Sequence, residues 1–234
     1  MRLVGYALLG LVTLSLARVP EAAPTDGVVT GTVRFLRGGK ETTITDGFIY
    51  LMAVRNGHQI DPKPATATIA QKHRRFTPNR IVIPVGSTVA FPNNEVRAPE
   101  NDHNVFSPTN PSFDLQRYGG GKVKRRTFEH KGEYDIYCDL HVEMNAKVKV
   151  VESDYIVPVI NGGFELKAVP AGKYKVVAWA PDSAESKETI VVIAGETTQV
   201  PQLNVQLGRA KPTHTRVNNT PYPSPIEPGR YGER

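Results

Sequence analysis

Short alternating runs of apolar and polar residues dominate the chain from Gly27 onward. Each run is rich in Val, Ile, Thr, Phe and Tyr and is bounded by Gly, Pro or Asn, which is typical of strands separated by turns. No long segment repeats its apolar residues with a helical period. The expected strands are residues 28–36, 48–54, 80–84, 88–91, 123–128, 134–138, 146–151, 163–168, 173–179, 188–193 and 197–207. Strands this short and this closely spaced predict an all-β protein built from sandwiches or barrels.

The N-terminal end has a different pattern. A basic start is followed by an uncharged apolar run over residues 3–16, which is typical of an export signal. We expect a signal peptide over residues 1–17, cleaved after Ala17; cleavage after Ala23 is the less favourable alternative because proline follows it. The apolar run is shorter than the roughly 20 residues of a spanning helix, and an uncleaved anchor stays open as an alternative. The protein is therefore expected in the periplasm or secreted, with no stable membrane span after cleavage.

The C-terminal end, residues 208–234, is rich in proline and poor in apolar residues. Such a segment cannot bury enough surface to fold, so we expect disorder, with an arm laid on a partner as the alternative. The formal net charge of the chain is +6, and this segment supplies half of it through five Arg or Lys residues against two Glu. The folded part is then too weakly basic to predict a nucleic-acid partner. Its one basic cluster is expected to be a solvated face, or a docking site for an acidic redox partner: Lys122, Lys124, Arg125 and Arg126.

The only cysteine, Cys138, follows an expected strand and is joined within seven residues by His141 and Met144. A thiolate, an imidazole and a thioether together are suited to copper. Zinc is the main competitor, but structural zinc prefers four Cys or His ligands and catalytic zinc usually takes His or carboxylate in place of methionine. An odd cysteine in an exported protein otherwise pairs between chains or stays reactive. A cysteine that binds a metal needs no second cysteine. The pattern therefore favours a copper site over the alternative, in which Cys138 is a small buried residue and Met144 fills the core.

A blue-copper site needs a second histidine in addition to these three residues. The best candidate is His103, which lies 35 residues before Cys138 and is separated from it by sequence of strand type. Alternation along residues 134–138 directs Cys138 to the inner face and Asp139 to the outer face. The remaining histidines show no clustering with the site and are expected on the surface: His58, His73, His130 and His214.

With these residues in this order, the region resembles a cupredoxin with the short ligand loop of amicyanins, in which Cys, His and Met are also spaced C-x-x-H-x-x-M. The resemblance covers roughly residues 68–152. It is carried by further matches in the same order: Phe76-x-Pro78, residues 81–89, Phe91-x-Asn93-Asn94 and His103-Asn104-Val105. It implies a Greek-key β-sandwich that holds one type 1 copper ion, with His103, Cys138 and His141 as the trigonal ligands and Met144 as the axial ligand.

The same resemblance implies that Asn104 ties the two ligand loops together by hydrogen bonds, and that His141 is the exposed electron port. The chain also departs from the family. Many members with this loop have proline directly after the second histidine, whereas this chain has Val142 and then Glu143. Whether this chain has the apolar docking patch of the family around His141 is therefore left open.

Residues 163–179 form a second pattern of strand, turn and strand, with Pro170 and Gly172 at the break. They resemble the carboxypeptidase regulatory-like domain, a small transthyretin-like β-sandwich. The opening pattern of that family, Gly31-x-Val33 followed by residues 48–51, lies far upstream. We therefore expect one split sandwich, with a cupredoxin domain inserted in it; tandem domains are the alternative. The expected boundaries are 25–58 and 153–207 for the split sandwich and 59–152 for the insert.

The function expected from these features is one-electron transfer with a redox partner protein that the sequence does not identify. No second metal cluster supports oxidase or nitrite-reductase chemistry, so no enzyme is expected. One alternative is copper handling without electron transfer, although three methionines in the whole chain are few for such a site. Another is an adhesion module that uses a cupredoxin only as structure.

Overall fold

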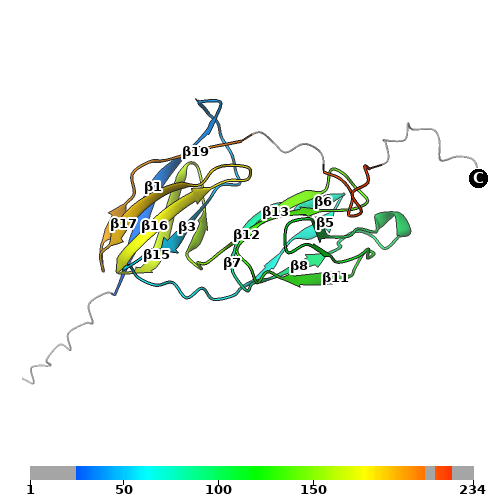
Figure 1. Ribbon diagram of the computed structural model, residues 1–234, viewed down its shortest axis with the longest axis horizontal. Helices are drawn as coiled ribbons and strands as arrows, with labels where there is room; N and C mark the ends of the chain where they lie inside the picture. The colour runs from blue at the N-terminus through cyan, green and yellow to red at the C-terminus, as the bar shows by residue number, and fades with distance from the viewer. Residues whose placement is uncertain (1–24, 209–213, 223–234) are drawn as a thin grey trace, which may run out of the picture.

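The computed structural model describes residues 25–208 and 214–222 and confirms the all-β class (Figure 1). This part of the chain contains strands and one short 3-10 helix, η1 (Pro99–Asn101), but no α-helix. None of its helices is long and apolar enough to cross a membrane. The predicted signal peptide at residues 1–17 lies outside the described residues.

One group of strands forms a sandwich that we call the first sandwich. Strand β1 (Asp26–Arg37) is the centre of one sheet, in which it pairs with β2 (Lys40–Glu41), β15 (Gly163–Pro170), β18 (Thr197–Gln199) and β19 (Leu203–Gln206). The opposing sheet has the order β14 (Ile156–Pro158), β3 (Phe48–Ala53), β16 (Gly172–Trp179) and β17 (Ser186–Val192). Their inner faces enclose one apolar core.

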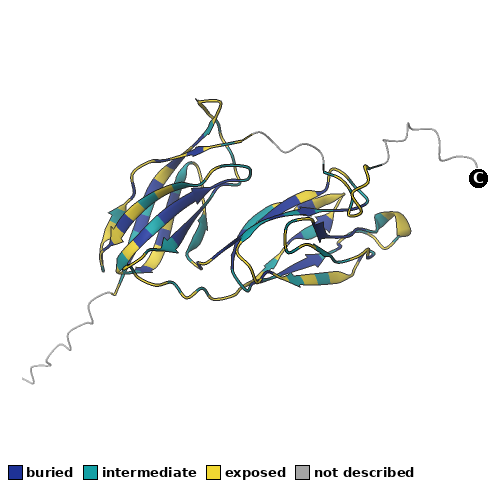
Figure 2. Cartoon of the chain, in the orientation of Figure 1, coloured by how far each residue is buried: buried dark blue, intermediate teal, exposed yellow. Residues whose placement is uncertain are grey.

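Alternation explains how β1 forms this core. Its buried residues include Val29, Val33 and Phe35, whereas Arg34 is exposed between two of them. Gly31 interrupts the apolar series because it faces Phe164 of β15 in the antiparallel register, and a Cβ there would lie 2.7 Å from the phenyl ring. A glycine opposite an aromatic ring lets that ring cover the strand. Figure 2 shows the resulting alternation of buried and exposed residues along the strands.

A second group of strands forms the second sandwich. One sheet has the order β10 (Phe113–Asp114), β9 (Phe106–Ser107), β12 (Gly132–Tyr137), β13 (Asn145–Val151) and β7 (Arg80–Pro84). The other has the order β11 (Val123–Thr127), β8 (Thr88–Pro92) and β4 (Thr66–Thr68), and β5 (Ala70–Lys72) pairs with β6 (Arg75–Thr77). The core between them contains Phe91, Phe128, Ile136 and Cys138.

The order of the strands along the chain separates the two sandwiches cleanly. The chain runs through β1–β3 of the first sandwich, then through β4–β13 of the second, and then returns to the first for β14–β19. Within the described residues, no sheet contains strands of both sandwiches. The second sandwich therefore lies between two halves of the first in the sequence.

An apolar and charged contact joins the sandwiches. Trp179, which is fully buried, packs with Val82 and Val151 of the second sandwich, and its indole Nε1 donates to Glu133 at 2.9 Å. Lys147 of β13 is 4% exposed and binds Asp182 of the first sandwich at 3.1 Å. A buried ammonium group with carboxylate partners is costly to separate from them, so these contacts fix the relative placement of the sandwiches.

Two sequence expectations about strands need correction. Residues 197–207 form two strands, β18 and β19, because Pro201 between them has no N–H to continue the ladder. Several strands of two or three residues were also missed, since alternation is not measurable over so short a length. These are β2, β4, β5, β6, β9, β10 and β14.

Candidate metal centre

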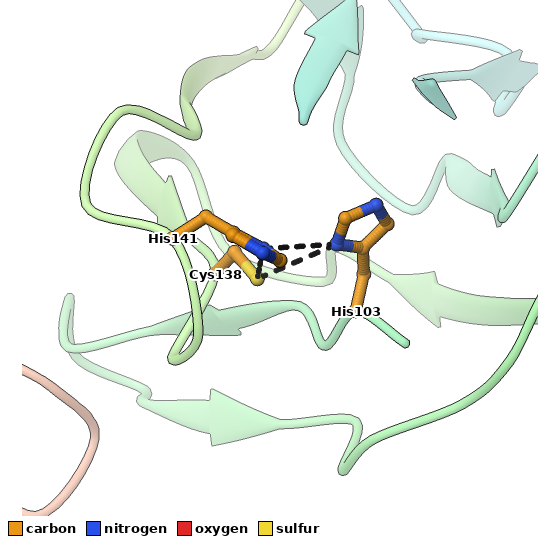
Figure 3. Close-up of side chains that lie close together, drawn as sticks. All are labelled: His103, Cys138 and His141. Atoms are coloured by element: carbon orange, nitrogen blue, oxygen red, sulfur yellow. Dashed lines mark hydrogen bonds between the residues drawn. The ribbon is translucent and has the colours of Figure 1, made fainter. Parts of the chain in front are cut away.

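Three side chains from the second sandwich converge on one point (Figure 3). His103 lies shortly after η1, where its backbone forms an antiparallel bridge with Tyr118. Cys138 directly follows β12, and His141 lies on the loop from β12 to β13. The sheet order places β9, which closely follows His103, next to β12, and this explains how residues 35 positions apart in the sequence meet.

The three donor atoms form a compact triangle. Nδ1 of His103 lies 3.1 Å from Nδ1 of His141 and 4.0 Å from Sγ of Cys138. Nδ1 of His141 lies 3.7 Å from the same Sγ. Donors that bind one ion at about 2.0–2.3 Å in a plane lie about 3.5–3.7 Å apart. The three separations of 3.1, 3.7 and 4.0 Å lie on both sides of this range, so small movements of the side chains would fit a metal ion with two nitrogen ligands and one sulfur ligand.

Burial sets the protonation of these groups. It lowers the pKa of His103 and of His141 below the usual range, so both rings are neutral at neutral pH and can offer a lone pair. Burial also raises the pKa of the Cys138 thiol, against the opposing effect of nearby backbone N–H groups. A bound metal needs the thiolate, so binding would release a proton.

The loop that carries His141 closes on itself through Met144. The backbone N–H of Met144 donates to the His141 carbonyl at 3.0 Å, and the N–H of Cys138 donates to the Met144 carbonyl at 3.3 Å. The Met144 side chain is fully buried and belongs to the same core as Cys138. These bonds hold the backbone of three candidate ligands in one turn, and the role of Met144 as axial ligand stays a prediction.

Asn104 connects the segment of His103 to the segment of Cys138. Its side-chain Oδ1 accepts a hydrogen bond from the backbone N–H of Asp139. Its Nδ2 donates to Asp114 Oδ1 at 3.2 Å, which fixes the orientation of the amide group. Asn104 is 2% exposed, so this link between the two segments is shielded from water.

Glu95, which lies behind the first histidine, was not predicted from any motif or spacing. Glu95 Oε1 lies 3.5 Å from Nε2 of His103, and it also accepts from the backbone N–H of Arg74 at 3.2 Å. Partial burial acts to raise the pKa of Glu95, but the hydrogen bonds from Arg74 and His103 lower it overall. A carboxylate at Nε2 favours the proton there and leaves Nδ1 free for a metal.

The C-terminal segment differs from its expected disorder where the structure describes it. Residues 214–222 lie on the loop of Cys138, and residues 209–213 and 223–234 lie outside the described part. The ring of His214 stacks on Tyr137 with 3.6 Å between centroids, and its Nε2 lies 3.1 Å from the Val142 carbonyl. His214 is therefore not a free surface histidine. Aromatic and charged side chains hold this segment, and composition alone did not reveal where they would bind.

Asp139 also differs from expectation, since it is 7% exposed although alternation directs it outward. Arg216 covers it and donates from Nη2 to Asp139 Oδ2 at 2.9 Å. Partial burial acts to raise the pKa of Asp139, but the hydrogen bonds from Arg216 and from the Val217 N–H lower it overall. The carboxylate stays ionised next to Cys138 because Arg216 of the C-terminal segment and Arg117, whose Nη2 lies 3.4 Å from Oδ2, compensate its charge.

The other predicted surface groups do not belong to the metal triangle. His58, His73 and His130 are exposed and are not part of the donor group. The basic cluster, which consists of Lys122 and three residues of β11, is only partly solvated. Lys124 donates to backbone carbonyls that include that of Gln116, at 3.3 Å, and Arg126 lies 5.1 Å from the centre of the Phe113 ring.

Comparisons with solved structures reach part of the chain. A copper-containing nitrite reductase from Thermus scotoductus is 29% identical over 40% of this chain, with a TM-score of 0.35, and the match spans 23% of the reductase. A purple cupredoxin from Nitrosopumilus maritimus is 26% identical over 36% of this chain and 99% of its own, with a TM-score of 0.31. Amicyanin from Paracoccus versutus is 24% identical over 37% of this chain and 81% of its own, with a TM-score of 0.33.

No family model and no curated protein matches the chain. The TM-scores are low, and the geometry of the site is the stronger indication of what the protein binds. The resemblance of the first sandwich to transthyretin-like domains stays a prediction.

Proposed function

We propose that the protein is an exported type 1 copper protein that carries single electrons and is not an enzyme. The observation that carries this proposal is the buried triangle of His103 Nδ1, His141 Nδ1 and Cys138 Sγ. Two imidazoles and one thiolate, with a weak methionine ligand, are the donor set of electron-transfer copper sites. Such an ion alternates between two oxidation states and supplies the redox chemistry.

The residues of the site are suited to holding their positions during transfer. His103 is held by Glu95 on one side and by the backbone of Tyr118 on the other. Cys138 is held by the turn that Met144 closes, and Asn104 fixes the next residue. Ligands held this firmly move little when the charge of the ion changes, which favours fast transfer. His141 is only half buried, and we propose its exposed edge as the route to a redox partner.

We also propose the domain boundaries that the sequence predicts, with a carrier domain at 59–152 inserted into a scaffold of 25–58 and 153–207. The strand pairing supports this division, since β4–β13 form the second sandwich and the other strands form the first. Within the described residues the three-donor group lies in the second sandwich alone. The first sandwich would then act as support for the carrier and not as a second redox site.

A copper titration with reversible electrochemistry tests the proposal. We expect one equivalent of Cu(II) to bind and to cycle reversibly by one electron, and a Cys138→Ala variant to lose this behaviour. Copper handling without electron transfer predicts binding with no reversible one-electron couple. Stronger retention of zinc than of copper at equal free concentration would also contradict the proposal.

A further inference from the structure

Residues 214–222, which we call the strap, lie against the second sandwich although they follow the last strand of the first (Figure 1, red). The chain leaves β19 at Gln206, and the Gly208 N–H donates to the Asp182 carbonyl at 2.7 Å. Asp182 also pairs with Lys147 of the second sandwich. Gly208, the last described residue before the strap, is therefore anchored at the contact between the sandwiches.

The strongest contact of the strap is a fork of hydrogen bonds on Asp139. Arg216 donates from Nη2 to Oδ2 at 2.9 Å and from Nε to Oδ1 at 3.2 Å. Its Nε also lies 3.2 Å from the backbone carbonyl of the same residue. The N–H of Val217 donates to Oδ1 at 3.0 Å. Bidentate pairs of this kind are strong and fix direction, so the strap fixes both the side chain and the backbone of Asp139.

Two aromatic side chains of the strap hold the two residues that precede Asp139. The hydroxyl of Tyr222 donates to the Cys138 carbonyl at 2.5 Å, and His214 stacks on Tyr137. The rings of His214 and Tyr222 also meet edge to face, 5.2 Å apart. The strap thus contacts three consecutive residues, of which the middle one carries the thiolate ligand of the proposed copper site.

We propose that the strap positions the metal centre, with Arg216 and Tyr222 as the positioning residues; this inference rests on the proposed function. Held on both sides, the backbone of Cys138 has one placement, and so does its sulfur. Arg216, together with Arg117 at 3.4 Å, also compensates the negative charge of Asp139 next to the thiolate. Without the contribution of Arg216, the carboxylate would stabilise Cu(II) relative to Cu(I) and lower the reduction potential.

The test uses the full chain, with and without copper, in the variants Arg216→Ala, Arg216→Lys and Tyr222→Phe. Thr215→Ala is the matched control, because its side chain is exposed, whereas the hydrogen bonds of the strap with the loop come from His214, Arg216, Val217 and Tyr222. The first readout needs no metal: it is hydrogen exchange at the Asp139 amide, which donates to Asn104. Arg216→Ala should speed this exchange by about tenfold or more, Arg216→Lys and Tyr222→Phe by less, and Thr215→Ala not at all.

The second readout is the reduction potential of the copper-loaded protein, which should fall in Arg216→Ala and stay unchanged in Thr215→Ala. Adding Asp139→Asn to Arg216→Ala should restore much of it, because the uncompensated charge is then gone. If the exchange and the potential of both Arg216→Ala and Tyr222→Phe equal those of Thr215→Ala, the strap does not position the site. If Arg216→Ala does not fold, Arg216→Lys and Tyr222→Phe decide by the same criteria.

The two levels of the proposal fail differently. Faster exchange in the metal-free variants, together with no one-electron couple in the unaltered protein, would remove the electron-carrier function and keep the strap as a clamp on the loop. A normal couple in the unaltered protein, with no effect of Arg216→Ala or Tyr222→Phe, would remove the strap proposal and keep the carrier.

Discussion

At the scale of single residues, the site depends on groups that touch the ligands as much as on the ligands themselves. The sequence predicts Cys138, His141 and Met144 from their spacing, and the structure brings the first two together with His103. It could not predict Glu95 or Arg216. Both act on the site through long-range folding, and an acid or an arginine in a polar segment has no spacing that marks it.

Glu95 provides a direct test of this dependence. Replacing it with Ala removes the carboxylate that holds Nε2 of His103, and we expect copper affinity to fall by about 10–100-fold in a competition titration. Glu95→Gln should lose less, because its amide oxygen can still accept the hydrogen bond. Glu100→Ala is the control, since Glu100 is exposed on the same loop. Unchanged affinity in Glu95→Ala would show that the carboxylate does not orient the ring.

Met144, the predicted axial ligand, can be tested by a single substitution. Met144→Leu keeps the volume of a fully buried side chain, so the fold should be retained. We expect the thiolate-to-copper absorption band to remain and the reduction potential to shift, because the axial ligand tunes it. A potential equal to that of the unaltered protein would show that Met144 is not a ligand.

At the scale of elements, all strands of five or more residues were predicted, whereas shorter ones were missed or merged into one. Strand β1 shows why, since its buried and exposed residues alternate over most of its length. Strands β9 and β10 have two residues each and depend on their neighbours in the sheet. The position of the strap was also not predictable. Single polar and aromatic side chains hold it, and these leave no hydrophobic pattern in the sequence.

The pairing of β1 with β15 makes a prediction about Gly31. A Cβ at this position would lie 2.7 Å from the Phe164 ring and 3.0 Å from the Cβ of Val200. Gly31→Ala should therefore reduce the free energy of unfolding by about 1–3 kcal/mol, measured by urea denaturation. Thr32→Ala on the exposed face of the same strand is the control. Equal free energies of unfolding for Gly31→Ala and the unaltered protein would mean that β1 and β15 can move apart at this position without loss of stability.

At the scale of the whole molecule, ion pairs and an apolar contact combine two sandwiches into one unit. Glu185 of the first sandwich binds Lys149 of the second at 2.7 Å and accepts from the hydroxyl of Tyr50. Although burial opposes the shift, hydrogen bonds from Lys149, Lys187 and Tyr50 lower the pKa of Glu185 to about 2, against an ordinary value of 4.5. This interaction couples the stability of the molecule to pH.

The sign of this coupling follows from the lowered pKa. The stabilisation by Glu185 is fully present above its unfolded pKa and is lost as the pH falls from about 5 towards 2, with an upper limit of about 3 kcal/mol. Urea midpoints of Glu185→Gln should be reduced at pH 7 and should approach those of the unaltered protein only near pH 2. Exposed Glu129→Gln is the control. An equal deficit of Glu185→Gln at both pH values would contradict an electrostatic role.

The central claim is that Cys138 binds copper as a thiolate together with two histidines. The most direct measurement is the visible spectrum of the purified protein after one equivalent of Cu(II). We predict an intense thiolate-to-copper band that disappears in Cys138→Ala, while Thr215→Ala keeps it unchanged. Bound copper without that band, or a band that persists in Cys138→Ala, would contradict the account.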